Sequence, residues 1–230
     1  MLSRKRASFL TRSIAFAAVV GLANVAHAEE TEQALDYTAM TPEALAEHLL
    51  FETNSFRLDQ PVQEGGVARQ RLEQDEIQRA CSNIDGAAPD LETLIKVREM
   101  AEKSIVYPDK IELGDWERGR EYAWSGFGFR IGHNNDDHTT REAGGNCYNC
   151  HQIGADRQGG NLGPALFNYG KNRGNSPEML RLAYGIIYNA HAFFPCTDMP
   201  RIGYKEVLNQ QQIADVLAYL FDPESPVNQE

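Results

Sequence analysis

The sequence is poor in basic residues, with 22 Lys and Arg against 33 Asp and Glu and a formal charge of -11. Non-specific binding of nucleic acid requires Lys and Arg to displace counterions from phosphates, so this balance argues against a nucleic-acid partner. Long hydrophobic runs are also lacking, because the apolar run at residues 14–22 is shorter than the roughly 20 residues of a membrane-spanning helix. The composition is that of a globular chain and excludes collagen-like, disordered and polytopic membrane proteins.

The first 28 residues have the pattern of a signal peptide. Basic residues lie between positions 4 and 12, the apolar run follows, and Ala26-His27-Ala28 offers a small-x-small cleavage site. We expect cleavage after Ala28 and export to the periplasm, with no stable membrane insertion of the remaining chain. An uncleaved membrane anchor is the alternative.

Alternating strand patterns and repeats are missing as well, and the chain predicts an all-α fold with long loops. Caps and apolar periodicity place helices at about 41–50, 67–81, 91–105, 116–124, 177–190 and 210–221. The stripe expected inside the fifth helix contains Met179, Leu182, Ala183, Ile186, Ile187 and Ala190. Residues 159–174 are expected to form a loop. We divide the chain into a signal peptide at 1–28, an N-terminal helical extension at 29–113 and a second domain at 114–230.

Cys147-Tyr148-Asn149-Cys150-His151 is a C-x-x-C-H sequence, the attachment signal of a c-type haem. Two thiols three positions apart can add to the two vinyl groups of one haem, and the adjacent histidine then lies beneath the iron as an axial ligand. A thioredoxin-like redox site needs a βαβ pattern, and a structural zinc site needs a second close pair of ligands; both are missing. We therefore predict one covalent haem c bound by Cys147, Cys150 and His151.

The sixth iron ligand is expected to be Met199, in the loop before the last helix. A loop that presents a thioether suits His/Met ligation, which raises the reduction potential relative to two histidines. His191 is the alternative ligand, whereas Met179 has the position of a core residue. The carbonyl of Pro164 is expected to accept a hydrogen bond from the second nitrogen of His151 and so orient the ring. A simple turn proline is the alternative at this position.

Two haem thioethers leave Cys81 and Cys196 unassigned. In an oxidising compartment we expect a disulfide between them. On the chain-entropy model, closing so long a loop contributes roughly 4 kcal/mol. The bond would also tie the extension to the loop of Met199. A free, reactive Cys196 near the haem is the alternative.

The haem motif, the Gly-Pro loop, the late Met-Pro sequence and the amphipathic C-terminal helix resemble class I cytochromes c over about residues 114–222. One departure concerns the first helix of that fold. It usually has a glycine followed four residues later by an aromatic residue that packs on the last helix. Here Gly119 is followed by Ala123, with Tyr122 and Trp124 on either side. Either the register differs or another aromatic residue takes this role.

A closer resemblance is to SoxX, the monohaem subunit of the SoxAX cytochrome of thiosulfate oxidation. It rests on the stretches 114–120, 145–151, 161–164, 199–203 and 214–228. The stretch from Arg71 to Ser82 resembles the N-terminal extension of longer SoxX variants. Together these segments extend over most of the chain after the signal peptide, and the tail is the most specific of them.

The resemblance implies a role in a two-subunit L-cysteine S-thiosulfotransferase, which joins thiosulfate oxidatively to a cysteine of the carrier SoxYZ. The partner subunit SoxA would hold the catalytic haem, and this chain would accept electrons and pass them to a soluble cytochrome c. No catalytic acid, base or nucleophile is implied here. A stand-alone monohaem carrier and a gas-binding sensory protein with a displaceable Met199 are the alternatives.

Overall fold

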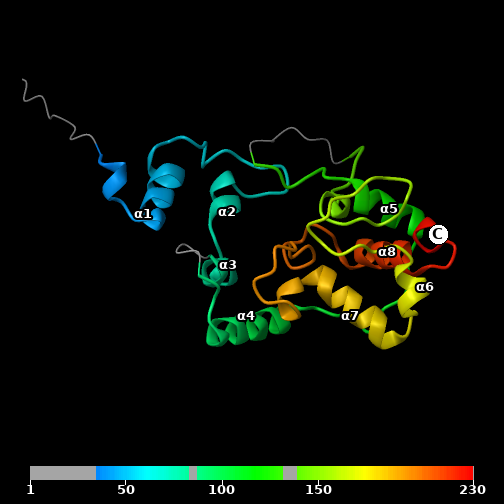
Figure 1. The fold of residues 1–230 in the computed structure, drawn as a ribbon. Coiled ribbons are helices and arrows are strands. Elements are labelled where there is room, and N and C mark those ends of the chain that lie inside the picture. The colour runs from blue at the N-terminus through cyan, green and yellow to red at the C-terminus, as the bar shows by residue number, and fades with distance from the viewer. Residues whose placement is uncertain (1–34, 83–86, 132–138, 230) are drawn as a thin grey trace, which may run out of the picture. The chain divides into compact units, whose positions relative to one another are not determined.

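The computed structural model describes residues 35–82, 87–131 and 139–229 (Figure 1). Across these residues the regular structure is helical, apart from one isolated β-bridge between Pro61 and Val67. The all-α prediction is confirmed. No helix in the described part is long and apolar enough to cross a membrane. The predicted signal peptide lies outside the described residues.

The described residues from 39 to 229 form one compact unit, which contains most of the predicted extension together with the predicted haem domain. The division at 113/114 stays a prediction. Two groups of buried side chains make up the interior. The larger lies among α5, α7 and α8, and the smaller consists of Ile77, Val97, Ala101 and Ala192. Ile105 contacts both groups, so the extension and the haem region share a continuous interior.

The extension contains α1 (Pro42–Glu47), a π-helical turn (His48–Glu52), α2 (Ala68–Leu72), α3 (Glu76–Cys81) and α4 (Leu91–Ser104). The single helix expected at 67–81 is wrong, because Asp75 begins a new one. Its carboxylate accepts a hydrogen bond from the Gln78 N–H, while Gln78 Oε1 accepts one from the Asp75 N–H. This capping box defines the start of α3.

The remaining elements are α5 (Trp116–Trp124), η3 (Cys147–Asn149), α6 (Tyr169–Arg173), α7 (Pro177–Tyr188), η4 (Ala190–Ala192), α8 (Gln210–Phe221) and η5 (Pro226–Asn228). Helix α6 lies in the segment expected to be a loop. It has only five residues, which is too short to show an apolar period in the sequence.

Helices α5 and α8 cross in direct contact, as Figure 1 shows for the green and red-brown helices. Gly119 makes the close approach possible. A Cβ at this position would lie 1.9 Å from the Asp215 carbonyl oxygen and 3.0 Å from the Tyr219 Cβ. Ala123 is buried, so a small residue stands where the aromatic residue usual in this fold would lie. Helices α5 and α8 therefore cross as in class I cytochromes c, although no aromatic residue lies four positions after Gly119.

Asp215, a fully buried carboxylate in α8, fastens the start of α5 to this crossing. Its Oδ1 accepts hydrogen bonds from the Asp115 N–H and from Gln211 Nε2, each at 3.0 Å. Arg118 Nε lies 3.5 Å from Oδ2. A buried carboxylate is tolerated only when it is paired and hydrogen-bonded, and these contacts supply its partners. The Asp115 side chain has a separate role, since its Oδ1 caps α5 by accepting from the Glu117 and Arg118 N–H groups at 2.8 and 3.2 Å.

The C-terminal tail closes the end of α8. Ser225 Oγ donates to the Tyr219 carbonyl, and Asn228 Nδ2 donates to the Leu220 carbonyl at 3.1 Å. The amide oxygen of Asn228 accepts a hydrogen bond from the Lys171 N–H in α6 at 3.1 Å. Carbonyls that a helix end would leave unpaired are thereby satisfied.

The apolar stripe expected on α7 is partly wrong. Ala183 and Ile187 are buried as expected, but Leu182 is 37% exposed and Tyr184 is buried. The reason is the linker before α5, which packs on this side of α7. The Tyr184 hydroxyl donates to the Val106 carbonyl at 3.1 Å.

Gly119→Ala should destabilise the protein by about 3 kcal/mol, because the new methyl group would overlap backbone atoms that cannot move without separating α5 from α8. Urea unfolding measures this loss. Glu121→Ala, on the exposed side of the same helix, is the matched control and should change stability by less than about 0.5 kcal/mol. Equal unfolding midpoints for the two variants would contradict the importance of the contact.

Candidate haem site

The C-x-x-C-H segment is a single tight turn. Cys147–Asn149 form one 3₁₀ turn, and the His151 N–H donates to the Cys147 carbonyl at 2.9 Å. Asn146, just before the turn, has a φ of 50°, in the left-handed region that asparagine adopts more readily than most residues. The turn therefore places two half-buried thiols and the imidazole in one compact segment. Burial raises the pKa of the Cys147 thiol to about 11.

The loop after the motif packs directly on it. The Gly160 N–H donates to the Tyr148 carbonyl at 2.8 Å, and the Gly163 N–H donates to the Cys150 carbonyl at 2.9 Å. A Cβ at Gly163 would lie 2.3 Å from Cε1 of the His151 ring. Any larger residue here would displace the imidazole, so this close approach requires glycine.

The His151 ring is oriented by the contact expected from the sequence. Its Nδ1 lies 2.8 Å from the Pro164 carbonyl oxygen. A carbonyl only accepts, so Nδ1 carries the proton and donates. The Nε2 atom of the neutral ring then keeps its lone pair, which is the form that binds a metal.

Met199 lies in the methionine loop, which we define as residues 193–203. Its side chain is half-buried against the same core group that Cys147 contacts. Cys196, three residues earlier, forms a disulfide with Cys81, with an S–S distance of 2.11 Å. The structure thus contains the disulfide expected from the sequence, and the bond joins the extension to the loop that carries Met199.

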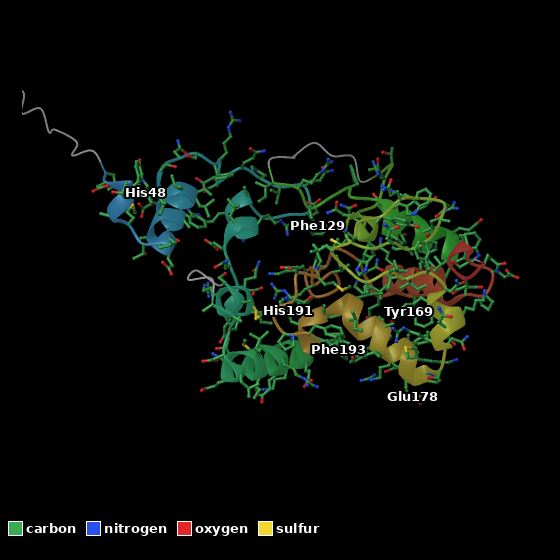
Figure 2. All side chains as sticks on the ribbon, in the orientation of Figure 1. His48, Phe129, Tyr169, Glu178, His191 and Phe193 are labelled. Carbon is green, nitrogen blue, oxygen red and sulfur yellow. A yellow bond between two sulfur atoms is a disulfide. The ribbon has the colours of Figure 1, made fainter. Side chains whose placement is uncertain are left out.

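His191, the alternative ligand, is buried in η4 beside this disulfide (Figure 2). The Cys196 N–H donates to His191 Nδ1 at 3.1 Å. Burial, followed by the nearby charge of Arg201, lowers the pKa of His191, which favours the neutral ring. A neutral ring that accepts at Nδ1 carries its proton on Nε2, and Nε2 then has no lone pair for a metal. The two histidines are therefore in opposite tautomers.

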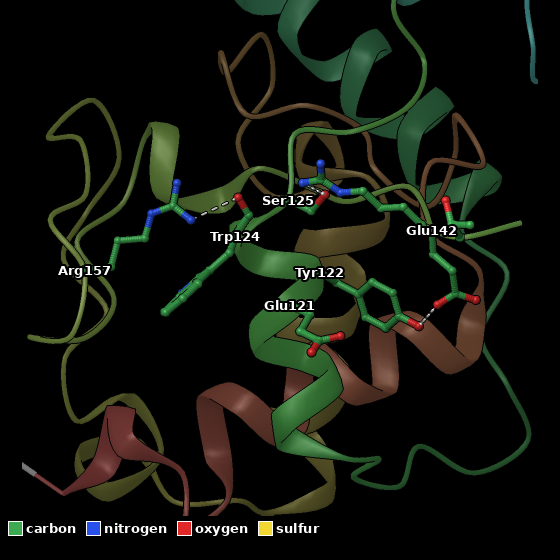
Figure 3. A pocket seen from close by; sticks show the side chains of 8 residues that line it. Glu121, Tyr122, Trp124, Ser125, Glu142 and Arg157 are labelled. Carbon is green, nitrogen blue, oxygen red and sulfur yellow. Dashed lines mark hydrogen bonds between the residues drawn. The ribbon is translucent and has the colours of Figure 1, made fainter. Parts of the chain in front are cut away.

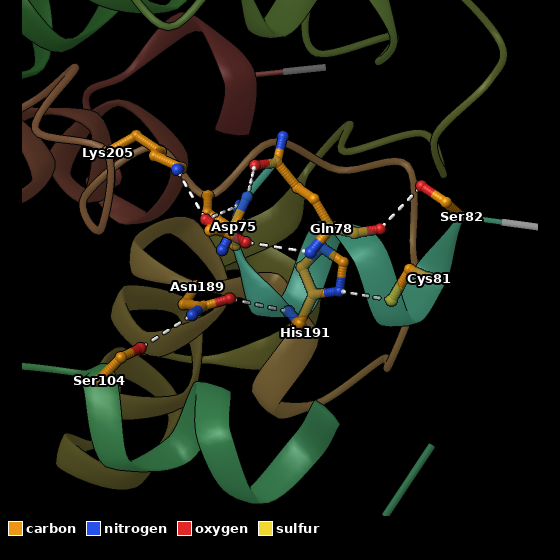
Figure 4. A network of polar contacts seen from close by, with 9 residues as sticks. Asp75, Gln78, Cys81, Ser82, Ser104, Asn189, His191 and Lys205 are labelled. Atoms are coloured by element: carbon orange, nitrogen blue, oxygen red, sulfur yellow. Dashed lines mark hydrogen bonds and ion pairs between the residues drawn. The ribbon is translucent and has the colours of Figure 1, made fainter. Parts of the chain in front are cut away.

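A second link joins the extension to the methionine loop. Asp75 Oδ2 accepts hydrogen bonds from Arg201 Nη2 and Lys205 Nζ, each at 2.7 Å (Figure 4). Burial alone would raise the pKa of Asp75, but the hydrogen bonds from Arg201 and Lys205 outweigh it and hold the pKa well below its usual range. The Arg201 side chain is only 5% exposed, so its charge depends on this carboxylate.

The residues present fit a covalent haem. The motif supplies two thiols outside any disulfide and an imidazole with an available Nε2, and the methionine loop supplies a thioether. Arg201 Nη1, two residues after Met199, is buried and has no hydrogen-bond acceptor among the residues that the structure describes. Buried donors are seldom left unpaired, and the propionates of a haem are acceptors of the opposite charge.

An open cleft of about 550 Å³ lies beside α5 (Figure 3). Several of its polar side chains are paired: the Tyr122 hydroxyl donates to Glu142, Arg141 donates to Ser125 Oγ at 3.2 Å, and Arg157 donates to the Trp124 backbone carbonyl at 3.2 Å. Because these groups are already paired, we assign no ligand to the cleft.

The helical fold and the C-x-x-C-H turn define a c-type cytochrome, and the family model for cytochrome c matches residues 141–222. Residues 141–222 are therefore a cytochrome c domain, which carries covalently attached haem c and transfers electrons. A relative in Aquifex aeolicus (strain VF5), described as an uncharacterized lipoprotein, is 38% identical over 158 residues. The match covers 67% of this chain and 73% of the relative.

Sequence reasoning missed the roles of Asp75 and Arg201. The signal at Asp75 is its capping box with Gln78, which indicates a helix start and says nothing of a partner 126 residues away. Arg201 belongs to the stretch 199–203 that resembles SoxX, but an arginine at this position does not by itself indicate a contact with Asp75. Both roles depend on the folding of the extension against the methionine loop.

Proposed function

We propose that this cytochrome is the SoxX-type electron-transfer subunit of a SoxAX L-cysteine S-thiosulfotransferase. It would accept electrons from its partner subunit SoxA when thiosulfate is coupled to the cysteine of SoxYZ, and pass them to a soluble cytochrome c. The observation that carries the proposal is the resemblance to SoxX in stretches spread from Arg71 to Asn228.

In this proposal Cys147 and Cys150 hold the haem, and His151 and Met199 bind its iron. Haem iron, when bound, supplies a one-electron couple. The contrast between the two histidines favours Met199 over His191 as the sixth ligand, because hydrogen bonding leaves Nε2 available in His151 and protonated in His191. Methionine ligation raises the reduction potential, which suits a chain that accepts electrons.

The chemistry of the coupling sets the number of electrons. Joining a thiol to thiosulfate forms a sulfur–sulfur bond and releases two electrons and the thiol proton. Each coupling therefore delivers two electrons, one at a time, to a monohaem acceptor. Bond formation belongs to SoxA and SoxYZ, so the proposal requires no acid, base or nucleophile from this chain.

The extension supports a subunit rather than a simple carrier. It is disulfide-bonded to the methionine loop through Cys81 and adds α4 to the surface. Leu91 and Ile95, one turn apart on α4, are 73% and 51% exposed. Exposed apolar residues are common at protein interfaces, so α4 offers a surface for a partner.

Three observations support export to the periplasm. The first 28 residues have the signal-peptide pattern. The structure contains a disulfide, which persists in oxidising compartments. The Aquifex relative is described as a lipoprotein, and lipoproteins are exported proteins.

A tagged pull-down from the periplasm of cells grown on thiosulfate, run on a haem-stained gel, tests the proposal. We expect a second haem-bearing polypeptide in near-equal amount, absent from an untagged strain. Adding thiosulfate and reduced SoxYZ to the purified pair should reduce the haem of this chain, whereas this chain alone should stay oxidised. Recovery of the chain alone, loaded with haem, would instead support the stand-alone carrier.

A further inference from the structure

Helix α3 is attached to the methionine loop at both of its ends, where Figure 4 labels Asp75 and Cys81. Asp75, the residue that caps its start, is hydrogen-bonded to Arg201. Cys81, its last residue, forms the disulfide with Cys196. Cys196 lies three residues before Met199 and Arg201 lies two after it. The two attachments therefore flank the proposed sixth ligand on both sides.

The backbone of the loop needs such support. Cys196 has a φ of 58°, in the left-handed region that non-glycine residues seldom adopt. A residue in this conformation stays there only when its surroundings hold it. The disulfide and the hydrogen bond from the Cys196 N–H to His191 hold the side before Met199. The ion pair between Asp75 and Arg201 holds the residues that follow Met199.

The ion pair also resists opening of the loop. With the Asp75 carboxylate in place, the buried guanidinium of Arg201 has a hydrogen-bonded partner of opposite charge. Without it, Nη2 of the buried guanidinium would lose its charged acceptor, which is strongly unfavourable. Moving Arg201 into water would relieve that cost. Because Met199 is only two residues away along the chain, the same movement would also displace Met199.

We infer that Asp75 is a positioning residue for the sixth iron ligand. It holds Arg201 and Lys205 against α3 and thereby keeps the methionine loop closed over the iron. Asp75 itself makes no contact with the haem iron in this role. The inference rests on the proposed ligation by His151 and Met199 and extends it to a residue of the N-terminal extension.

Asp75→Asn is the variant that isolates this role. Asparagine keeps the oxygen that caps α3, since Asp75 Oδ1 accepts from the Gln78 N–H. It replaces Oδ2, the oxygen that accepts from both cations, with a donor. Glu76→Gln is the matched control: it removes the same charge from the adjacent residue, whose partner Lys96 lies on α4 and not on the methionine loop.

Titration of the oxidised protein with imidazole measures how often the loop opens, because imidazole binds the iron only where Met199 has left it. Its apparent affinity is proportional to the open fraction. We expect Asp75→Asn to bind imidazole about tenfold more tightly than the wild type, and Glu76→Gln to stay within about twofold of it. Equal affinities for the two variants would overturn the inference, even if Asp75→Asn lowered the urea midpoint.

The near-infrared spectrum separates this inference from the ligation on which it rests. A wild-type protein without the methionine–iron band would show that Met199 is not the ligand, whatever the variants do. If Asp75→Asn does not fold, Asp75→Ser decides, because serine also caps a helix but has no carboxylate oxygen to accept from Arg201 and Lys205. Tighter imidazole binding than in Glu76→Gln supports the role of Asp75, and equal binding overturns it.

Discussion

Met199→Ala should abolish the weak near-infrared band of the oxidised protein and lower its reduction potential. The band arises from the bond between the thioether sulfur and ferric iron, so it cannot survive the loss of that sulfur. The potential falls because a thioether stabilises ferrous iron better than water or a nitrogen ligand does. Absorption spectroscopy and a redox titration of the same sample measure both effects.

Met179→Ala is the matched control for this variant. Met179 is also half-buried against the main core, but it lies on α7. Its truncation should cost about 2 kcal/mol of stability through lost packing and leave the band unchanged. A band that persists in Met199→Ala would move the ligand role elsewhere. His191→Gln would then be the next variant to test, because His191 is the nearby alternative.

The double variant Cys81→Ala/Cys196→Ala should be less stable than the wild type by about 4 to 5 kcal/mol on the chain-entropy model. The disulfide connects residues 115 positions apart, so its loss restores much conformational freedom to the unfolded chain. Since small domains are stable by only about 5–15 kcal/mol in total, the expected loss is a large fraction. Urea unfolding followed by circular dichroism measures it without a reductant that would also reduce the haem.

The same variant separates global stability from the state of the loop. Ion pairing by Asp75 remains possible in it, so we expect the near-infrared band to be retained at low urea and lost before global unfolding. Mass analysis of the wild-type protein after thiol alkylation is the control for the bond itself. Two alkylated cysteines in the native protein, or an unchanged urea midpoint in the variant, would contradict the structural role of the disulfide.

Much of the site could be predicted because its chemistry depends on neighbours in the chain. The spacing of Cys147, Cys150 and His151 directly indicates covalent attachment of a haem. The expected hydrogen bond from His151 Nδ1 to the Pro164 carbonyl oxygen is also present, at 2.8 Å. Capping residues before α4, α7 and α8 are equally local, and these helices begin where the sequence indicated. Local patterns predict such features because the interacting groups are few residues apart.

The errors in the predicted helices have two kinds of cause, one local and one distant in the chain. The helix expected at 67–81 is broken, although the break has a local cause in the capping box of Asp75. The exposed position of Leu182 has a distant cause, because the linker covers another side of α7 and buries Tyr184. Periodicity identifies an apolar stripe but does not identify the segment that will cover it.

By itself, the sequence determined the all-α class, the cytochrome c domain and the covalent haem, since each follows from patterns within a few residues. Tertiary structure alone decided which nitrogen of His191 carries the proton, because a turn of the folded chain brings the Cys196 N–H to its Nδ1. It also decided that Asp75 meets Arg201 across 126 residues. Such a pairing depends on how α3 packs beside the methionine loop, and no local propensity encodes that arrangement.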